Sequence, residues 1–139
     1  MGHGAEGQRE EEEVNMGGHQ NVKFRFQDLR IWQLAIEIAD ELFDIADDLK
    51  RKKLYRFAEQ LRSAAMSMSN NIAEGSGSSW NRDFSNFLNI ARRSTFENAN
   101  ISILLYRRHI IGDSRLDAIL KNLDSLCRQI TSFQHTLKS

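Results

Sequence analysis

The chain has 139 residues, of which 40% are hydrophobic and 27% are charged, and its 19 basic and 19 acidic residues balance. That length excludes a second hydrophobic core, and the apolar content excludes a wholly disordered chain. The zero net charge conceals an asymmetry, because Arg9 and five glutamates give residues 1–20 a charge of −4 and leave +4 for residues 21–139. The part of the chain that we expect to fold is therefore mildly basic.

Proline is absent, and the only glycines beyond residue 20 are Gly75, Gly77 and Gly112. Long helices are favoured over sheets, because few turn residues are present and no proline interrupts a helix. The one cysteine, Cys127, cannot form an internal disulfide, and no stretch of about 18 apolar residues could span a bilayer. No signal-peptide core follows the N-terminus, so we expect a soluble, cytoplasmic, all-α protein.

The first segment, residues 1–22, combines Gly, Gln and Asn with a run of four glutamates and has almost no large apolar side chain. Such a composition buries too little apolar surface to offset the loss of chain entropy, so we predict a disordered acidic tail. Met16 is an alternative translation start within this segment. Residues 23–139 are predicted to form the helical domain.

The first helical pattern starts at Asp28, where apolar residues begin to recur in alternating steps of three and four. This spacing places them on one broad, buried face of a helix. The main stripe comprises Trp32, Ala35, Ala39, Leu42, Ala46 and Leu49. Three isoleucines lie away from that stripe, and we expect them to be candidates for subunit contacts: Ile31, Ile38 and Ile45.

A second helical pattern repeats the same alternation from Leu54 to Ile72, after the basic segment Lys50–Lys53. We predict that this helix ends at Gly75 in a left-handed cap, because glycine tolerates a positive φ. The glycine- and serine-rich segment 75–79 predicts a loop.

A third helix is predicted to begin at Trp80, with a hydroxyl of Ser78 or Ser79 as its cap. Its middle, residues 92–100, is poor in large apolar side chains. The Gly-Asp-Ser sequence at 112–114 predicts the end of this helix.

The same Gly-Asp-Ser sequence is expected to cap a fourth helix, in which apolar residues hold a heptad register from Leu116 to Leu137. Long helices with short connections must reverse direction at each loop. The sequence therefore predicts an antiparallel, up-down-up-down four-helix bundle.

Catalytic patterns are absent from the sequence. A di-iron bundle needs Glu-x-x-His pairs, and none occurs, so each of the four histidines is interpreted as a lone surface residue. Cys127 has no histidine one turn away to activate it, and no phosphate-binding glycine loop or nucleophile elbow is present. We therefore expect a protein that is not an enzyme, with no metal and no cofactor.

Basic residues gather in three clusters, whereas acidic residues concentrate on the first predicted helix. Arginine and lysine bind phosphate groups, so the clusters are candidates for nucleic-acid binding. The candidate residues are Lys50, Arg51, Lys52, Lys53, Arg92, Arg93, Arg107 and Arg108. On charge alone, solvated faces that only keep the protein in solution explain them equally well.

Three stretches of the chain resemble the four-helix-bundle proteins encoded in intervening sequences of bacterial 23S ribosomal RNA genes. The similarity covers about residues 24–135 and keeps the spacing between motifs. It departs from the family at Ser69, where a proline is usual, so we expect a straighter second helix. The stretches are Phe26–Ala35, Gln60–Gly75, and Asp83–Ala91 with Ser94 and Glu97.

The resemblance implies a ring-like homo-oligomer, often a pentamer, that binds nucleic acid and has no enzymatic activity. A related branch contains the accessory proteins of diversity-generating retroelements, which bind a reverse transcriptase and its RNA. Among the motif residues, Asn70, Asn71 and Glu74 are expected to cap the second helix and bind the adjoining loop, with direct ligand contact as the alternative. The motif positions singled out are Trp32, Asn70, Asn71, Glu74, Gly75 and Glu97.

Together these observations lead to one functional hypothesis and one alternative. The hypothesis is a non-enzymatic oligomeric bundle that binds structured RNA, or a nucleic-acid-processing partner such as a reverse transcriptase, through clustered arginines and lysines. The alternative is a protein-interaction scaffold whose outer apolar residues dock a partner or another subunit, without direct nucleic-acid binding.

Overall fold

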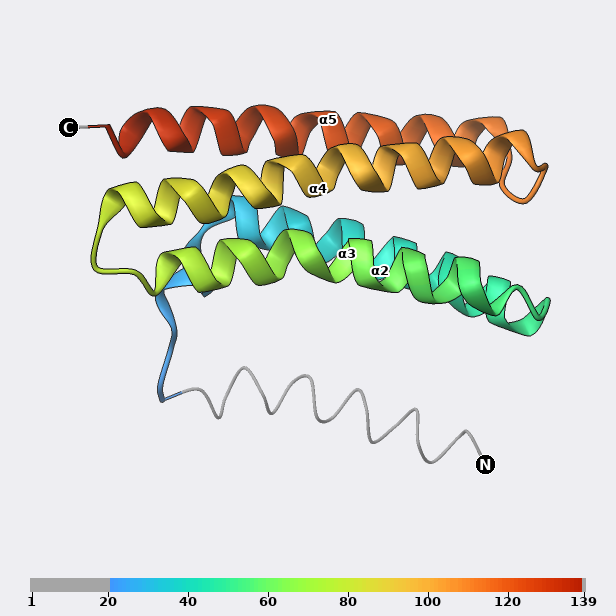
Figure 1. Ribbon diagram of the computed structural model, residues 1–139, viewed down its shortest axis with the longest axis horizontal. Helices are drawn as coiled ribbons and strands as arrows, with labels where there is room; N and C mark the ends of the chain where they lie inside the picture. The colour runs from blue at the N-terminus through green and yellow to red at the C-terminus, as the bar shows by residue number, and fades with distance from the viewer. Residues whose placement is uncertain (1–20, 139) are drawn as a thin grey trace.

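The computed structural model describes residues 21–138. Within that range it contains helices and no strand, so the predicted all-α class is confirmed there. The predicted tail, residues 1–22, lies outside the described residues except for its last two positions. The elements are a 3-10 turn η1 (Arg25–Asp28) and the helices α2 (Arg30–Arg51), α3 (Tyr55–Ser76), α4 (Asn81–Arg107) and α5 (Asp113–Thr136) (Figure 1).

Each long helix lies beside the next one in the chain, and α5 returns to the side of α2. An ion pair between Arg115 of α5 and Glu41 of α2, at 3.5 Å, joins the first and last helices. The helices α2 and α4 are not in contact and occupy one diagonal. The α2–α3 and α4–α5 loops lie at one end of the molecule, and the α3–α4 loop lies at the other (Figure 1).

The buried face of α2 is broader than the predicted stripe, of which Ala35, Ala39, Leu42, Ala46 and Leu49 are buried as expected. Ile31, Ile38 and Ile45 are 4%, 3% and 1% exposed, so their assignment to subunit contacts is wrong. Because α3 and α5 pack on α2 from two sides, the buried face is centred on these isoleucines. Trp32, at the edge of the predicted stripe, is only half-buried.

A polar seam joins α3 and α4 at mid-length. The hydroxyls of Ser67 and Ser94 are 2.8 Å apart, and the fully buried Asn98 amide donates to the carbonyl of Ala64 at 2.8 Å. Small side chains let the two helices approach closely at this level. This packing explains why residues 92–100 are poor in large apolar side chains.

The end of α3 also departs from the prediction. Gly75 has no positive φ and lies inside the helix, which continues to Ser76, so the left-handed cap is wrong. Gly75 is instead required for close packing, because a Cβ built there would lie 2.7 Å from the Phe87 Cβ and 2.8 Å from the Phe84 ring.

The predicted serine caps are wrong as well. The first residue before α4 is Trp80, and no side chain caps either α4 or α5. The Ser78 hydroxyl accepts the N–H of Trp80 at 3.1 Å and so stabilises the loop. Ser78 lies too far before α4 for its hydroxyl to reach the free N–H groups in the first turn of the helix.

None of the helices described here is both long and apolar enough to cross a membrane.

Candidate nucleic-acid interface

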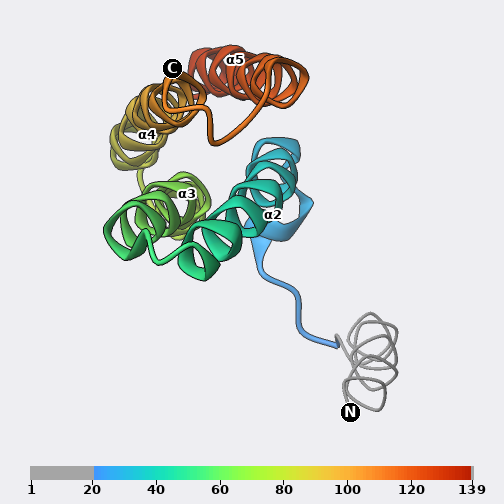
Figure 2. The same cartoon turned by 90° about the vertical axis from the view of Figure 1, so that its right-hand side faces the viewer.

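The fold brings two of the three predicted basic clusters to the same end of the bundle. Lys50–Lys53 close α2, and Arg107 and Arg108 close α4, and both loops face the viewer in Figure 2. Arg56, in the first turn of α3, adds a further cation at this end. We call this surface the basic end: Lys50, Arg51, Lys52, Lys53, Arg56, Arg107, Arg108 and His109.

The loop after α2 begins with a Schellman turn, a common ending of α-helices. The N–H of Leu54 donates to the carbonyl of Leu49 at 2.8 Å, and the N–H of Lys53 donates to that of Lys50 at 2.9 Å. Leu54 packs against the core and anchors the turn. The lysines between these two leucines are consequently held outward.

The loop after α4 repeats this geometry. The N–H of Ile110 donates to the carbonyl of Leu105 at 2.9 Å, and that of His109 donates to Tyr106 at the same distance. Ile110 packs against the core as Leu54 does. One end of the bundle therefore presents two basic turns of the same backbone geometry.

Each turn places a basic residue where glycine is usual. Lys53 and His109 have φ angles of 65° and 63°, and within the described residues they are the non-glycine positions with positive φ. A side chain in this left-handed conformation costs about 1–2 kcal/mol. The Schellman turn itself requires a left-handed residue at this position, so each helix end holds a basic side chain there.

The charges of the basic end are available to a ligand. Its lysines and arginines are all exposed. Within residues 21–138, Arg51 is the one among them that forms an ion pair, with Asp48. In the part of the chain that the structure describes, the remaining cations have no carboxylate partner that a phosphate group would need to displace.

The carboxylate of Asp113, beside the second basic turn, is hydrogen-bonded to the hydroxyl of Tyr106. Asp113 takes part in a hydrogen bond with Tyr106, and this bond, together with the negative charge of Asp113, raises the pKa of Tyr106 above its ordinary value. Asp113 forms no ion pair with Arg107 or Arg108 in the described part of the chain.

The third predicted cluster lies elsewhere. Arg92 and Arg93 precede the end of α4 by 15 and 14 residues, which places them about 21 Å from the basic end. Arg92 is half-buried and donates from Nε to the Thr131 hydroxyl at 3.0 Å, which ties α4 to α5. Arg93 is exposed. Their role in nucleic-acid binding stays a prediction.

Comparison with known proteins identifies the family of the chain. The family model described as 23S rRNA-intervening sequence protein matches residues 27–132. The chain belongs to this family. A crystal structure from Bacteroides thetaiotaomicron VPI-5482, described as a protein of unknown function from the S23 ribosomal protein family, has the same fold. It superposes with a TM-score of 0.71 at 22% identity, covering 75% of this chain and 97% of the other. No match was found among curated proteins.

The three polar motif residues of α3 differ in their surroundings. The Asn71 amide donates to the carbonyl of Ser67 at 2.7 Å, one turn back, whereas Asn70 and Glu74 are exposed. The expectation that these side chains cap the helix is wrong. The last carbonyls of α3 accept backbone N–H groups from residues 77 and 78 instead. The motif residue Glu97 is also exposed, and Trp32 packs against Phe26 with ring centroids 5.0 Å apart.

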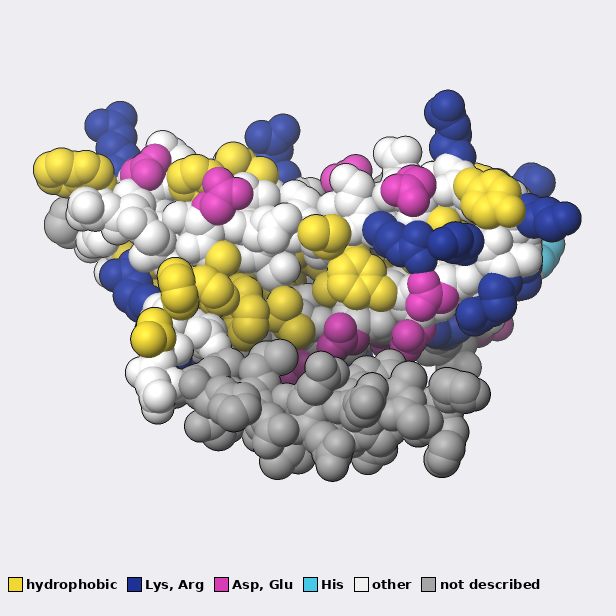
Figure 3. Space-filling model, turned by 90° about the horizontal axis from the view of Figure 1, so that it is seen from below, with side chains coloured by type: hydrophobic (Ala, Val, Ile, Leu, Met, Phe, Trp, Pro, Cys, Tyr) yellow, Lys and Arg dark blue, Asp and Glu magenta, His cyan; other side chains and the backbone are white. Residues whose placement is uncertain are grey.

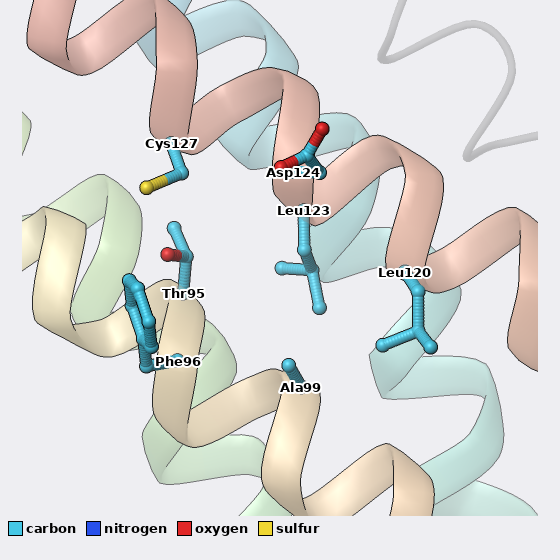
Figure 4. Close-up of a pocket in the computed structure, with 7 residues that line it drawn as sticks. All are labelled: Thr95, Phe96, Ala99, Leu120, Leu123, Asp124 and Cys127. Atoms are coloured by element: carbon cyan, nitrogen blue, oxygen red, sulfur yellow. The ribbon is translucent and has the colours of Figure 1, made fainter.

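The hollow between α4 and α5 has no catalytic arrangement in the residues described. Its volume is about 160 Å³, and in Figure 4 Thr95, Phe96 and Ala99 of α4 face residues of α5 across it. The cysteine there, Cys127, is half-buried. Among residues 21–138 no three His, Cys, Asp or Glu side chains lie close enough to hold a metal ion. The residues of α5 that line the hollow are Leu120, Leu123, Asp124 and Cys127.

Sequence reasoning identified the basic clusters but missed that two of them are equivalent. The signal was present, because Leu-Lys-Arg-Lys-Lys-Leu at 49–54 and Leu-Tyr-Arg-Arg-His-Ile at 105–110 share the same pattern of leucine, basic residues and a second aliphatic residue. The sequence-based prediction treated the first as a linker and the second as part of a helix. Aligned with each other, the two segments predict two similar turns.

Proposed function

We propose that this family member is an antiparallel, up-down-up-down bundle without enzymatic activity, that it assembles into a ring-like homo-oligomer, and that it binds structured RNA. The basic end is the proposed RNA-binding surface. The observation that carries the proposal is the pair of basic Schellman turns, which hold exposed cations at one end of the bundle, all but Arg51 without an ion pair among residues 21–138.

RNA is the ligand class that fits this surface best. Lysine and arginine on short, ordered turns contact phosphate oxygens, and contacts of this type make no demand on base sequence. Structured RNA offers phosphates from two strands, and the two turns offer two sets of cations. The proposed protein partner is a nucleic-acid-processing enzyme such as a reverse transcriptase, by analogy with the accessory proteins of diversity-generating retroelements, and the proposed location is the cytoplasm.

Removing one cation from each turn tests the proposal. We expect Lys52→Ala with Arg108→Ala to weaken binding of an RNA hairpin and to lower the slope of log K against log salt by about 1.5, because two counterion-releasing phosphate contacts are lost. Fluorescence anisotropy at several salt concentrations measures both quantities. The matched control is Arg82→Ala with Lys138→Ala, which removes the same charge at the opposite end. Equal losses from the two variants would contradict the proposal.

A second test uses the strain in the two turns. We expect Lys53→Gly with His109→Gly to raise the free energy of unfolding by about 1–2 kcal/mol, because relief of the left-handed backbone at two positions exceeds the entropy cost of about 0.5–1 kcal/mol for each glycine. The same variant should bind the RNA hairpin more weakly. Urea unfolding and anisotropy, measured on one preparation, give the two results. A gain in stability without any loss of affinity would exclude these two side chains from the interface.

The second candidate function is the protein-interaction scaffold. The observation in its favour is the exposure of large apolar side chains on the long helices, among them Phe96 at 63% and Met66 at 48%. A scaffold would form oligomers or bind a protein partner and show no salt-sensitive affinity for RNA. The anisotropy experiment therefore distinguishes the two functions.

A further inference from the structure

The outer surface of α2 combines carboxylates with apolar side chains that are exposed in part. Between Ile31 and Leu49 the helix carries six acidic residues and no lysine or arginine. Three of them pair with arginines, and Glu37, Asp40 and Asp44 are exposed, without an ion pair in the described part of the chain.

Apolar side chains lie beside these carboxylates, toward α3. Ile36 and Phe43 of α2 are half-buried, and Met66 of α3 is 48% exposed. The ion pair between Arg62 and Asp47 fixes the register of the two helices and places Met66 one turn further on, level with Phe43. Figure 3 shows hydrophobic side chains along the middle of this face and acidic ones beside them. We call this surface the acidic groove: Ile36, Phe43 and Met66, bordered by Glu37, Asp40 and Asp44.

The outer surface of α4 has the opposite charge. Phe96 and Ile103 are 63% and 40% exposed, and the exposed Arg93 lies one turn before Phe96. We call these three residues the cationic ridge. Because α2 and α4 occupy one diagonal of the bundle, the ridge and the groove face in different directions and cannot meet within one chain.

The two surfaces also match in spacing along the helices. Phe96 precedes the end of α4 by 11 residues, whereas Ile36 and Phe43 precede the end of α2 by 15 and 8. Phe96 of a second copy placed side by side would therefore lie between them, as a knob lies in a hole.

The charges align at the same register. Arg93 and Glu37 both lie 14 residues before the end of their helices. Asp40 follows Glu37 by one turn on the same face. Side-by-side copies would therefore bring Arg93 of one chain to the unpaired carboxylates of the next.

We propose that the cationic ridge of one copy docks in the acidic groove of the next, so that the chain associates head to tail. The inference rests on the self-association contained in the proposed function and specifies its two surfaces. A head-to-tail contact between different surfaces forms a ring when the rotation closes. In a ring with its axis along the helices, all basic ends lie on one rim, where they act on RNA together.

Two variants, each changed on one surface, test the pairing. The groove variant carries Glu37→Lys and Asp40→Lys, and the ridge variant carries Arg93→Glu and Phe96→Asp. All four positions are exposed, so far-UV circular dichroism should show unchanged helix content. Native mass spectrometry is expected to detect an oligomer for the wild-type chain and a single chain for each variant. The control, Lys121→Glu with Asn122→Asp on the exposed face of α5, should keep the oligomer.

Mixing the two variants in equal amounts is the decisive measurement. Each retains one intact surface, so the mixture should form a complex of two chains, one of each kind. Absence of that complex would overturn the head-to-tail pairing, because a contact between identical surfaces is not restored by mixing. A wild-type monomer would overturn the proposed self-association as well. An oligomer that persists in both variants would overturn only the choice of surfaces.

Discussion

Replacing Phe84 with alanine is expected to lower the free energy of unfolding by about 3–5 kcal/mol, the range typical of a buried phenylalanine. The side chain is 2% exposed and lies near the start of α4. Its removal leaves a cavity where the N-terminal turn, α4 and α5 meet.

The contacts of Phe84 explain why the cost is expected at the upper part of that range. Its ring meets Phe133 of α5 edge to face with centroids 5.4 Å apart, and the Arg25 guanidinium lies 5.3 Å from its centroid. An aromatic pair adds about 0.5–1.5 kcal/mol to stability beyond the burial of its area. A cation–π contact adds about 0.5–1 kcal/mol. Phe84 therefore links the N-terminal turn, α4 and α5.

Urea unfolding followed by circular dichroism measures the effect. The control is Trp80→Ala, which removes a larger aromatic side chain only four positions earlier. Trp80 is 74% exposed, so its loss should change stability by no more than about 0.5 kcal/mol. A loss of no more than about 0.5 kcal/mol in Phe84→Ala would mean that Phe84 is not part of the core.

Helix existence and approximate limits followed from the sequence, because apolar spacing reports directly which residues share a helix face. The exact buried face did not follow for α2. Trp32 and Ile38 are both apolar, and only the positions of α3 and α5 decide that Ile38 is enclosed while Trp32 remains at the edge. Local spacing contains no information on which neighbours cover a helix.

The candidate site was predicted in part. Charge clustering identified Lys50–Lys53 and Arg107–Arg108, and a bundle with alternating helix directions places both loops at one end. The positive φ angles of Lys53 and His109 could not be predicted, since the rule for helix ends expects glycine there. The same rule predicted a left-handed cap at Gly75, which is wrong. The backbone stays helical at Gly75, and the absent Cβ makes room for Phe84 and Phe87.

Gly75→Ala provides the second large expected effect. Alanine favours a helix over glycine by up to about 1 kcal/mol, so propensity alone predicts stabilisation. The new Cβ would lie 2.7 Å from the Phe87 Cβ and 3.2 Å from the Phe84 carbonyl, and neither atom can rotate away. Overpacking of this kind costs about 1–3 kcal/mol, so we expect a net loss of about 1–2 kcal/mol in urea unfolding.

Gly77→Ala is the matched control, two residues later in the same sequence. Its Cβ would lie 3.4 Å from the Glu74 carbonyl and the backbone φ is −80°, so alanine fits without strain. We expect its stability to be unchanged or higher by up to about 1 kcal/mol. If Gly75→Ala stabilises the protein as much as Gly77→Ala, the close approach of α3 and α4 at Gly75 is wrong.

A double-mutant cycle separates the packing effect from helix propensity. The Cβ introduced by Gly75→Ala would also lie 2.8 Å from the Phe84 ring, and Phe84→Ala removes that ring. In the Phe84→Ala background, Gly75→Ala should therefore cost less than in the wild-type chain, by about 0.5–3 kcal/mol as is typical for residues in contact. Propensity is independent of the residue at position 84 and predicts no difference. Non-additivity in this direction would show that Gly75 and Phe84 act together, through the contact between the end of α3 and the start of α4.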